Sequence, residues 1–208
     1  MNNSKLIRFD GSDFLIGVGV LFVLLIFLWQ QKRRLSYLLF FSIFWIYLLV
    51  VVKTVIFPFI INLDYGSPRI MPTINLIPFY FGYCSIPEYC VLGIVGNIIL
   101  TMPFGFGINF LVKVKPRNIL GLALAVGFGF EFSQLVISLV FRSGFRSIDI
   151  NDVILNAIGV LIGYALFRAF ALAYIKIAGY FEIKQKWLFA YIYDVSSQTQ
   201  DDDRPKNA

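Results

Sequence analysis

The chain has 208 residues, of which 59% are hydrophobic, 18% aromatic and only 14% charged. A soluble domain of this length is about half apolar and about a quarter charged, so the composition excludes an ordinary water-soluble protein. The formal charge of +6 does not indicate nucleic acid, because no such motif is present and the basic residues fall between apolar runs, which favours lipid headgroups.

Five segments are long and apolar enough to cross a bilayer, since a helix needs about 20 residues to span about 30 Å of hydrocarbon. These segments are residues 13–30, 35–57, 88–112, 119–141 and 152–175. Each should be helical, because unpaired backbone groups are very costly in lipid. The first run ends in WQQKRR and has no small-residue cleavage site, so we interpret it as a retained span and not as a signal peptide.

The basic loops predict the orientation of these spans. The basic segments QKRR (31–34) and KVKPR (113–117), together with Lys176, Lys184 and Lys186, all lie on one side of a five-span bundle. Positively charged loops favour the cytoplasm, so the N-terminus should be outside and the C-terminus inside. The predicted fold is therefore all-α, a polytopic membrane bundle of about five transmembrane helices.

The same pattern divides the chain into three parts. Residues 1–34 form an N-terminal anchor with a basic inner loop, and residues 35–175 form the main transmembrane domain. Residues 176–208 follow as an interfacial helix and a cytoplasmic tail. GYFEIKQKWLFAYIY (179–193) mixes aromatics with lysines, as interfacial helices do, whereas SSQTQDDDRPKNA (196–208) is expected to be disordered.

The outer loop 58–87 is rich in proline but contains NLIPFYFGY, which is too apolar for a simple solvated loop. We expect it to fold back onto the bundle or the membrane interface. Cys84 and Cys90 lie near this membrane end and could form a disulfide if that side is extracytoplasmic. No feature of the sequence requires the bridge, and two buried free thiols is the favoured interpretation.

Polar residues recur at helical spacing within the last three spans. The fourth span carries Gly127, Glu131, Gln134 and Ser138, the fifth carries Asp152, Asn156, Gly159 and Gly163, and the third carries Asn97. Intervals of three and four residues put each set on one helix face. Glu131 would lie about 15 Å below the outer end of its span, near mid-membrane.

An acid facing lipid would cost a few kcal/mol, so these faces should turn toward one another. We therefore predict an outward-open polar pocket between spans three, four and five, with Arg142, Arg146 and Asp149 at its rim. Gly159 and Gly163 form a GxxxG pair suited to close helix contact. Interhelical hydrogen bonds that only hold the fold remain an alternative for the amides.

Two further features concern helix ends and breaks. Asp149 and Asp152 flank the start of the fifth span, and either could be its N-cap. TMPFGFG (101–107) places Pro103 inside the third span, where it should kink or break the helix.

Four motifs occur in order over about residues 40–170: NLIPF (75–79), GNIILTMPFGF (96–106), FEFSQ (130–134) and SIDINDVILNAIGVLIG (147–163). Together they resemble the VanZ-like family, named after a teicoplanin-resistance accessory protein. The resemblance implies that residues 35–175 are a VanZ-like domain and that the chain is a multi-pass protein of the bacterial cytoplasmic membrane. It also implies a link to tolerance of glycopeptide or lipoglycopeptide antibiotics, without a mechanism.

The resemblance assigns importance to matching positions only. These are Asn75, Pro78, Asn97, Pro103, Gly105, Glu131, Gln134, Asp149, Asp152, Asn156 and Gly159. The arginines of LVFRSGFRS match no fixed position of the family. The candidate ligand-binding set is Asn75, Asn97, Glu131, Gln134, Arg142, Arg146, Asp149, Asp152 and Asn156.

Three functions fit these residues. The first is binding of a membrane lipid, a lipid-linked cell-wall precursor or a lipoglycopeptide, with the arginines meeting phosphate or carboxylate. The second is an intramembrane enzyme with Glu131 as catalytic acid or base, in which Asp149 and Asp152 could hold a divalent metal. The third is a transporter or scaffold. HExxH, GxSxG and phosphate loops are absent, as is histidine, so we expect no cofactor and no resident metal.

Overall fold

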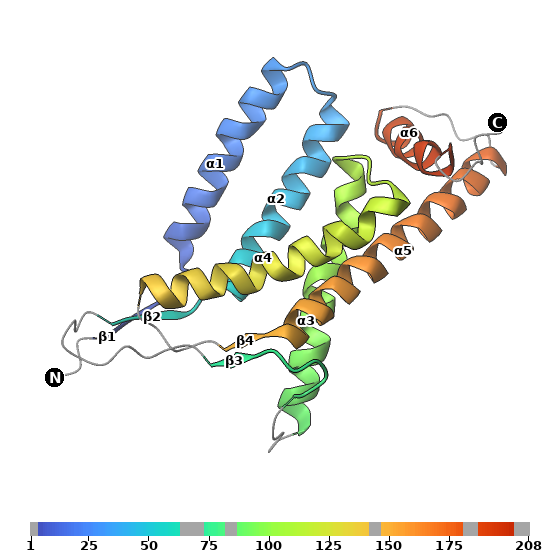
Figure 1. Ribbon diagram of the computed structural model, residues 1–208. Helices are drawn as coiled ribbons and strands as arrows, with labels where there is room; N and C mark the ends of the chain where they lie inside the picture. Colours follow the sequence, from blue (N-terminus) through green and yellow to red (C-terminus); the bar gives the residue numbers. More distant parts are fainter. Residues whose placement is uncertain (1–3, 63–72, 82–86, 142–146, 181–186, 202–208) are drawn as a thin grey trace.

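The computed structural model describes residues 4–62, 73–81, 87–141, 147–180 and 187–201 (Figure 1). Its helices are α1 (Gly11–Gln30), α2 (Leu35–Val55), α3 (Pro87–Gly107), α4 (Ile119–Val140), α5 (Ile150–Tyr180) and α6 (Leu188–Asp201), with 3₁₀ turns η1 (Ile108–Phe110) and η2 (Pro116–Asn118). Five of these helices, α1 to α5, are long and apolar enough to cross a membrane. The predicted all-α membrane architecture with five spans is thus confirmed.

Helix α5 forms the centre of the structure and packs against α3 and α4. Its core contacts include Ala157, Val160 and Tyr164, which meet Ile119 and Ala123 of α4. At about 1.5 Å per residue its 31 residues reach roughly 46 Å, more than the hydrocarbon thickness. The helix therefore continues past the span predicted from hydropathy.

Glycines allow the backbones of these three helices to touch. A Cβ at Gly159 or Gly163 of α5 would collide with main-chain carbonyls of α3, and a Cβ at Gly105 of α3 would collide with the carbonyl of Val160. Gly127 of α4 lies in the same way against the carbonyl of Val153. The predicted close contact at the GxxxG pair is confirmed, and it extends to two more glycines.

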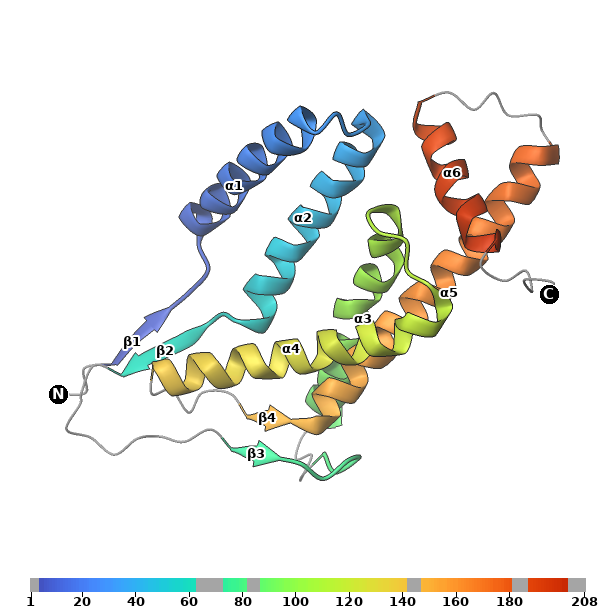
Figure 2. The same ribbon diagram turned by 45° about the horizontal axis from the view of Figure 1, so that its top comes forward.

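Helices α1 and α2 form a hairpin beside this three-helix core (Figures 1 and 2). Asp10 caps α1, because its side chain accepts hydrogen bonds from the backbone of Ser12 and Asp13. Trp45 of α2 donates its ring N–H to the carbonyl of Gly17, at 2.9 Å. Most other α1 side chains are exposed, as expected for a helix that faces acyl chains.

Two short strand pairs lie at the end of the bundle away from α6 (Figure 2). Strand β1 (Ser4–Ile7) runs antiparallel to β2 (Phe59–Asn62), and β3 (Ile74–Asn75) runs parallel to β4 (Ile148–Asp149). The sequence did not predict these strands. The β3 part of loop 58–87 does fold back onto the bundle, because β3 pairs with β4 at the start of α5, whereas β2 pairs with the N-terminal strand β1.

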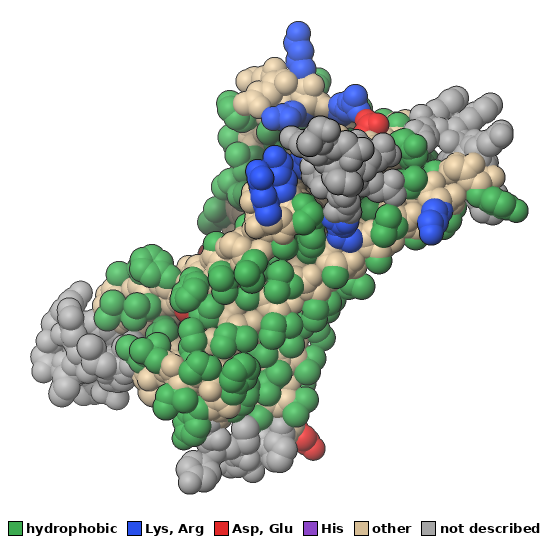
Figure 3. Space-filling model, turned by 45° about the vertical axis from the view of Figure 1, so that its right-hand side comes forward, with side chains coloured by type: hydrophobic (Ala, Val, Ile, Leu, Met, Phe, Trp, Pro, Cys, Tyr) green, Lys and Arg blue, Asp and Glu red, His purple; other side chains and the backbone are tan. Residues whose placement is uncertain are grey.

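Lysine and arginine side chains gather at the opposite end, around the α1–α2 turn and α6 (Figure 3). Hydrophobic side chains cover the middle of the molecule in the same view. Such a large exposed apolar surface is unusual for a soluble monomer but normal for a surface in contact with lipid.

Pro103 was predicted to kink or break the third span; helix α3 passes through it and continues to Gly107, so the helix is not broken there. Proline removes one helix hydrogen bond. Residues on both sides of it, Met102 and Gly105, contact the backbone of α5, and this packing holds the helix together.

The expected disorder of residues 196–208 is wrong as far as Asp201, where α6 ends. Tertiary contacts that could not be predicted from the local sequence stabilise this helix. Ser196 is fully buried, Asp194 forms an ion pair with Arg34 at 2.7 Å, and the Tyr191 hydroxyl donates to the carbonyl of Phe110. Tertiary packing therefore orders a polar segment that would not fold alone.

The favoured interpretation of two free thiols is also wrong, because Cys90 is disulfide-bonded. It lies in the first turn of α3, at the end that carries the strand pairs. Cys84 lies outside the described residues.

Candidate functional site

A cavity of about 350 Å³ lies between four helices near the strand-bearing end. It is lined by Thr54, Val55, Asn97, Leu100, Phe130, Glu131, Gln134, Ser147, Asp152 and Asn156. This volume falls at the lower end of the range for small-molecule sites, which is about 300–1,000 Å³. Five of the candidate residues from the sequence line it: Asn97, Glu131, Gln134, Asp152 and Asn156.

The helical spacing of α4 and α5 explains this convergence. Gly127, Glu131 and Ser138 are buried on one face of α4, and Asn156 and Gly159 are buried on one face of α5. The glycine contacts hold these faces close together, so the neighbouring polar side chains of α4 and α5 meet around the cavity. Polar groups on separate helices are thereby kept away from acyl chains.

Helix α2 supplies a wall that the sequence did not suggest. Thr54 and Val55 line the cavity, and the Gln134 side-chain amide donates to the carbonyl of Val55 at 3.0 Å. Thr54 lies near the end of α2. Its hydroxyl donates to the carbonyl of Val50 in its own helix, as many serines and threonines in helices do. No pattern in the sequence distinguishes it as a lining residue.

Two polar contacts join α3 to α5 beside the cavity. The Asn97 amide donates to Asp152 Oδ1 at 2.7 Å, and the Thr101 hydroxyl donates to the main-chain carbonyl of Asn156 at 2.8 Å. Thr101 is fully buried, but it does not line the cavity. Sequence reasoning missed it, although it lies four residues after Asn97 and hence on the same face.

Asn156 carries the least satisfied polar atom of the cavity. Its side chain is 2% exposed, and its Oδ1 has no hydrogen-bond partner among the residues that the structure describes. A buried acceptor in this state costs about 1–3 kcal/mol. Asn156 lies at the border of the cavity, so a hydrogen-bond donor of a bound molecule could pair with this oxygen and offset the unfavourable free energy.

Glu131 is 5% exposed and accepts a hydrogen bond from the backbone N–H of Asp149 at 2.9 Å. Strand β4 therefore lies beside α4, which brings Asp149 next to the buried carboxylate. The sequence placed Asp149 at the outer rim. The same segment pairs with β3, and this register places Asn75 opposite Asp149.

Asp149 and Asn75 support the cavity without lining it. Asp149 Oδ1 accepts from the Asn75 amide at 3.0 Å and from the backbone N–H of Asn151 at 2.8 Å. The second bond is that of a helix N-cap, so of the two candidates Asp149 caps α5, while Asp152 contacts Asn97. Arg142 and Arg146 lie outside the described residues.

Asn151 is a structural residue that sequence reasoning missed. It is 2% exposed, accepts from the backbone N–H of Phe79 at 2.6 Å and donates to the carbonyl of Tyr80 at 2.8 Å. These bonds fasten the NLIPF segment over the start of α5. Its position two residues after Asp149, within a run of alternating polar residues, was the available signal.

Replacing Asn151 with alanine is expected to release residues 76–81 from the bundle. Each lost bond contributes roughly 0.5–1.5 kcal/mol, so amide exchange at Phe79 should accelerate about tenfold or more. Hydrogen–deuterium exchange in detergent measures this change. The amide of Ile56, which bonds to the carbonyl of Val52 at the end of α2 and lies outside the released segment, is the internal control. Equal protection of Phe79 in both proteins would contradict the assignment.

The chemistry of the cavity favours molecules that donate hydrogen bonds. Its lining holds two carboxyl groups, Glu131 and Asp152, and the unpartnered carbonyl of Asn156, while none of the described lining residues is lysine or arginine. Hydroxyl and amine groups match such acceptors. Across the described residues, no three acidic, cysteine or histidine side chains converge as metal ligands would.

A model of the family described as VanZ/LLP1 matches residues 44–172. The matched range contains all of the described residues that line the cavity. It also contains the two paired strands, β3 and β4. No curated protein and no solved structure matches the chain.

Proposed function

Because the chain belongs to the VanZ/LLP1 family, we propose that its cavity binds the polar group of an envelope lipid or of another lipophilic ligand. The protein would act from the bacterial cytoplasmic membrane, with the cavity open toward the outer side. Binding would modulate the cell envelope and, through it, tolerance of glycopeptide or lipoglycopeptide antibiotics. Lipid-linked cell-wall precursors and lipoglycopeptides both combine a lipophilic part with donor groups.

One observation carries this proposal: polar side chains from four apolar helices line a common cavity, and one of them keeps an unpartnered buried acceptor. A bundle that used its polar residues only as helix contacts would pair them all, because unsatisfied groups are costly away from water. Asn97 and Gln134 are paired in this way, but Asn156 Oδ1 is not.

The outward direction of the cavity is supported by charge and by the disulfide. Basic residues of the α1–α2 turn and of the segment between η1 and η2 lie at the end opposite the cavity, and such residues favour the cytoplasm. Cys90 lies at the cavity end, and disulfides persist in oxidising compartments. Labelling single cysteines introduced at Ser12 and Lys115 with a membrane-impermeant thiol reagent in intact cells tests this orientation.

The direct biological test is a deletion strain in which envelope lipids and antibiotic tolerance are both measured. Wild type should restore both properties, whereas Glu131→Gln and Asp149→Asn should not, provided that each variant reaches the membrane at wild-type level. If the deletion changes neither the lipid profile nor tolerance, the proposed role in the envelope is wrong.

Replacing Asn156 with leucine is expected to separate binding from stability. The substitution removes a buried unpartnered carbonyl, so the melting temperature in detergent should stay the same or rise. Binding of teicoplanin or of a purified lipid-linked wall precursor should weaken roughly tenfold, which corresponds to one lost hydrogen bond. Retained affinity for whichever of these probes binds the wild type would contradict a ligand contact at Asn156.

An intramembrane enzyme acting on an envelope lipid is the second candidate. It is favoured by the burial of the Glu131 carboxyl beside the cavity, where an acid or base would meet a bound substrate. Incubating the purified protein with envelope lipids, with and without Mg²⁺, distinguishes the two: turnover that Glu131→Gln abolishes supports the enzyme, and binding without turnover supports the first proposal.

A further inference from the structure

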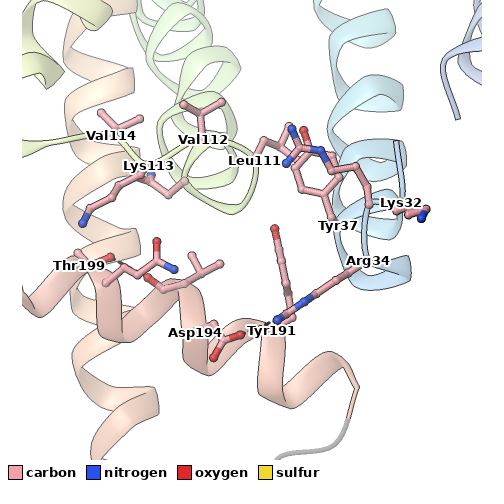
Figure 4. Close-up of a pocket in the computed structure, with 14 residues that line it drawn as sticks. Lys32, Arg34, Tyr37, Leu111, Val112, Lys113, Val114, Tyr191, Asp194 and Thr199 are labelled. Carbon is pink, nitrogen blue, oxygen red and sulfur yellow. Dashed lines mark hydrogen bonds and ion pairs between the residues drawn. The ribbon is translucent and has the colours of Figure 1, made fainter. Parts of the chain in front are cut away.

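A second cavity lies at the opposite end of the molecule, below the basic turn that joins α1 to α2. Its volume is about 450 Å³, and α6 closes one side of it (Figure 4). Four cationic side chains line it, Lys32, Arg33, Arg34 and Lys113, against a single described carboxylate, Asp194. Asp194 is bound by Arg34 at 2.7 Å, so the lining keeps a clear excess of positive charge.

The cavity is shaped by contacts between separate elements. The guanidinium of Arg33 lies over the Tyr37 ring, 5.2 Å from its centroid, which orients this cation beside the cavity. The Arg34–Asp194 ion pair ties the α1–α2 turn to α6 (Figure 4). Tyr191 of α6 also lines the cavity, and burial raises its pKa to about 12, so it stays neutral at physiological pH.

An apolar groove of about 380 Å³ begins beside this basic cavity and runs between α2 and α3. Phe40, Phe44, Met102 and Phe106 are among its lining residues. Phe40 stacks on Phe110 with ring centroids 4.3 Å apart, and it also stacks on Tyr191 at 5.6 Å. Since Phe40 and Phe110 line the groove while Tyr191 lines the cavity, the groove and the cavity are neighbours on either side of these rings.

We propose that the basic cavity and the adjoining groove bind one anionic phospholipid of the cytoplasmic leaflet, with its phosphate among the cations and an acyl chain along the aromatic groove. Basic sites between transmembrane helices on the cytoplasmic side suit anionic headgroups. The groove lies along the apolar helices α2 and α3, at the depth where the acyl chains of a bilayer would surround the protein. This site is separate from the ligand cavity at the other end and does not depend on its function.

The test compares two pairs of neutralising substitutions that remove the same charge. Arg33→Gln with Lys113→Gln removes two cations from the cavity, whereas Lys115→Gln with Arg117→Gln removes two exposed cations from the same end that do not line it. Native mass spectrometry of the full chain in neutral detergent measures binding of phosphatidylglycerol, phosphatidylcholine and inorganic phosphate. A third variant, Ile43→Trp, fills the groove and leaves the charges intact.

We expect the wild type to prefer phosphatidylglycerol over phosphatidylcholine. The cavity pair should weaken phosphatidylglycerol binding by on the order of tenfold or more, and the exposed pair by no more than about twofold. Ile43→Trp should also weaken phosphatidylglycerol binding. Asn156→Leu should leave it unchanged, which separates this site from the outer cavity.

Three results would overturn the proposal. Equal losses in the two charge pairs would mean diffuse attraction to a basic surface. Competition by inorganic phosphate as strong as that by phosphatidylglycerol, with Ile43→Trp unaffected, would mean a phosphate site without a lipid tail. No preference of the wild type for phosphatidylglycerol would mean no anionic lipid site. The melting temperature of each variant is measured as well, and a value close to that of the wild type excludes unfolding as the cause of weaker binding.

Discussion

Replacing Gly163 with alanine is expected to destabilise the protein strongly, although it adds only one methyl group. The added Cβ would collide with the carbonyl of Met102 and the backbone nitrogen of Phe106, and neither can rotate away as a side chain could. Helices α3 and α5 would have to separate. Overpacking of this kind costs about 1–3 kcal/mol, occasionally more, which lowers the melting temperature by roughly 2–12 °C in a chain of this size.

Gly105→Ala should behave in the same way, because its Cβ would collide with the carbonyl of Val160. Each helix offers a matched control. Gly96 of α3 and Gly179 of α5 have open space where a Cβ would lie, so alanine there should be neutral or slightly stabilising, since it favours helix.

The measurement is a thermal unfolding series in one detergent, with the four variants compared to wild type. Similar melting temperatures for Gly163→Ala and Gly179→Ala would show that the backbones do not touch at α3 and α5. A loss of stability confined to Gly105 and Gly163 would instead support the contact on which the geometry of the cavity depends.

Replacing Glu131 with glutamine is expected to have the largest effect on function. The amide keeps an oxygen that can accept the hydrogen bond from Asp149 N–H, so β4 should stay in place. One of the two carboxyl oxygens beside the cavity is replaced by an amide nitrogen, so an acceptor is lost. A hydrogen bond contributes about 0.5–1.5 kcal/mol, so affinity for a donor-bearing ligand should fall up to roughly tenfold.

Ser133→Ala is the matched control on the same helix. Ser133 donates to the carbonyl of Gly129 within α4 and does not line the cavity, so its loss should leave binding and tolerance unchanged. Binding of the wall precursor and of teicoplanin is measured on purified protein, and complementation is measured in the deletion strain. A Glu131→Gln protein that binds and complements like wild type would leave only a structural role for this carboxyl group.

The helical spacing was enough to predict which side chains of α4 and α5 would share a face. Intervals of three and four residues brought Glu131, Gln134, Asp152 and Asn156 toward one cavity, as the structure shows. Depth along a helix could be counted from the sequence in the same way. Neither rule predicts the path of a loop. For this reason Asp149 was expected at the rim of the pocket and not beside Glu131.

Residues with partners far along the chain were missed for a related reason. Asn151 fastens a segment more than 70 residues earlier, and α2 contributes Thr54 and Val55 through a contact with Gln134. Asn and Thr are compatible with many local structures. Their roles follow from the groups that surround them and not from their own type.

The sequence by itself determined that this is a five-span membrane bundle and which helix faces are polar, because hydrophobic length and helical period are local properties. Only the tertiary structure decided that α6 is ordered beyond the aromatic segment, that Pro103 is accommodated within α3, and that two cavities lie at opposite ends. These outcomes depend on backbone contacts between helices, such as those at Gly105 and Gly163, and on hydrogen bonds between distant segments. Such contacts form only when the elements come together, so no single stretch of the chain encodes them.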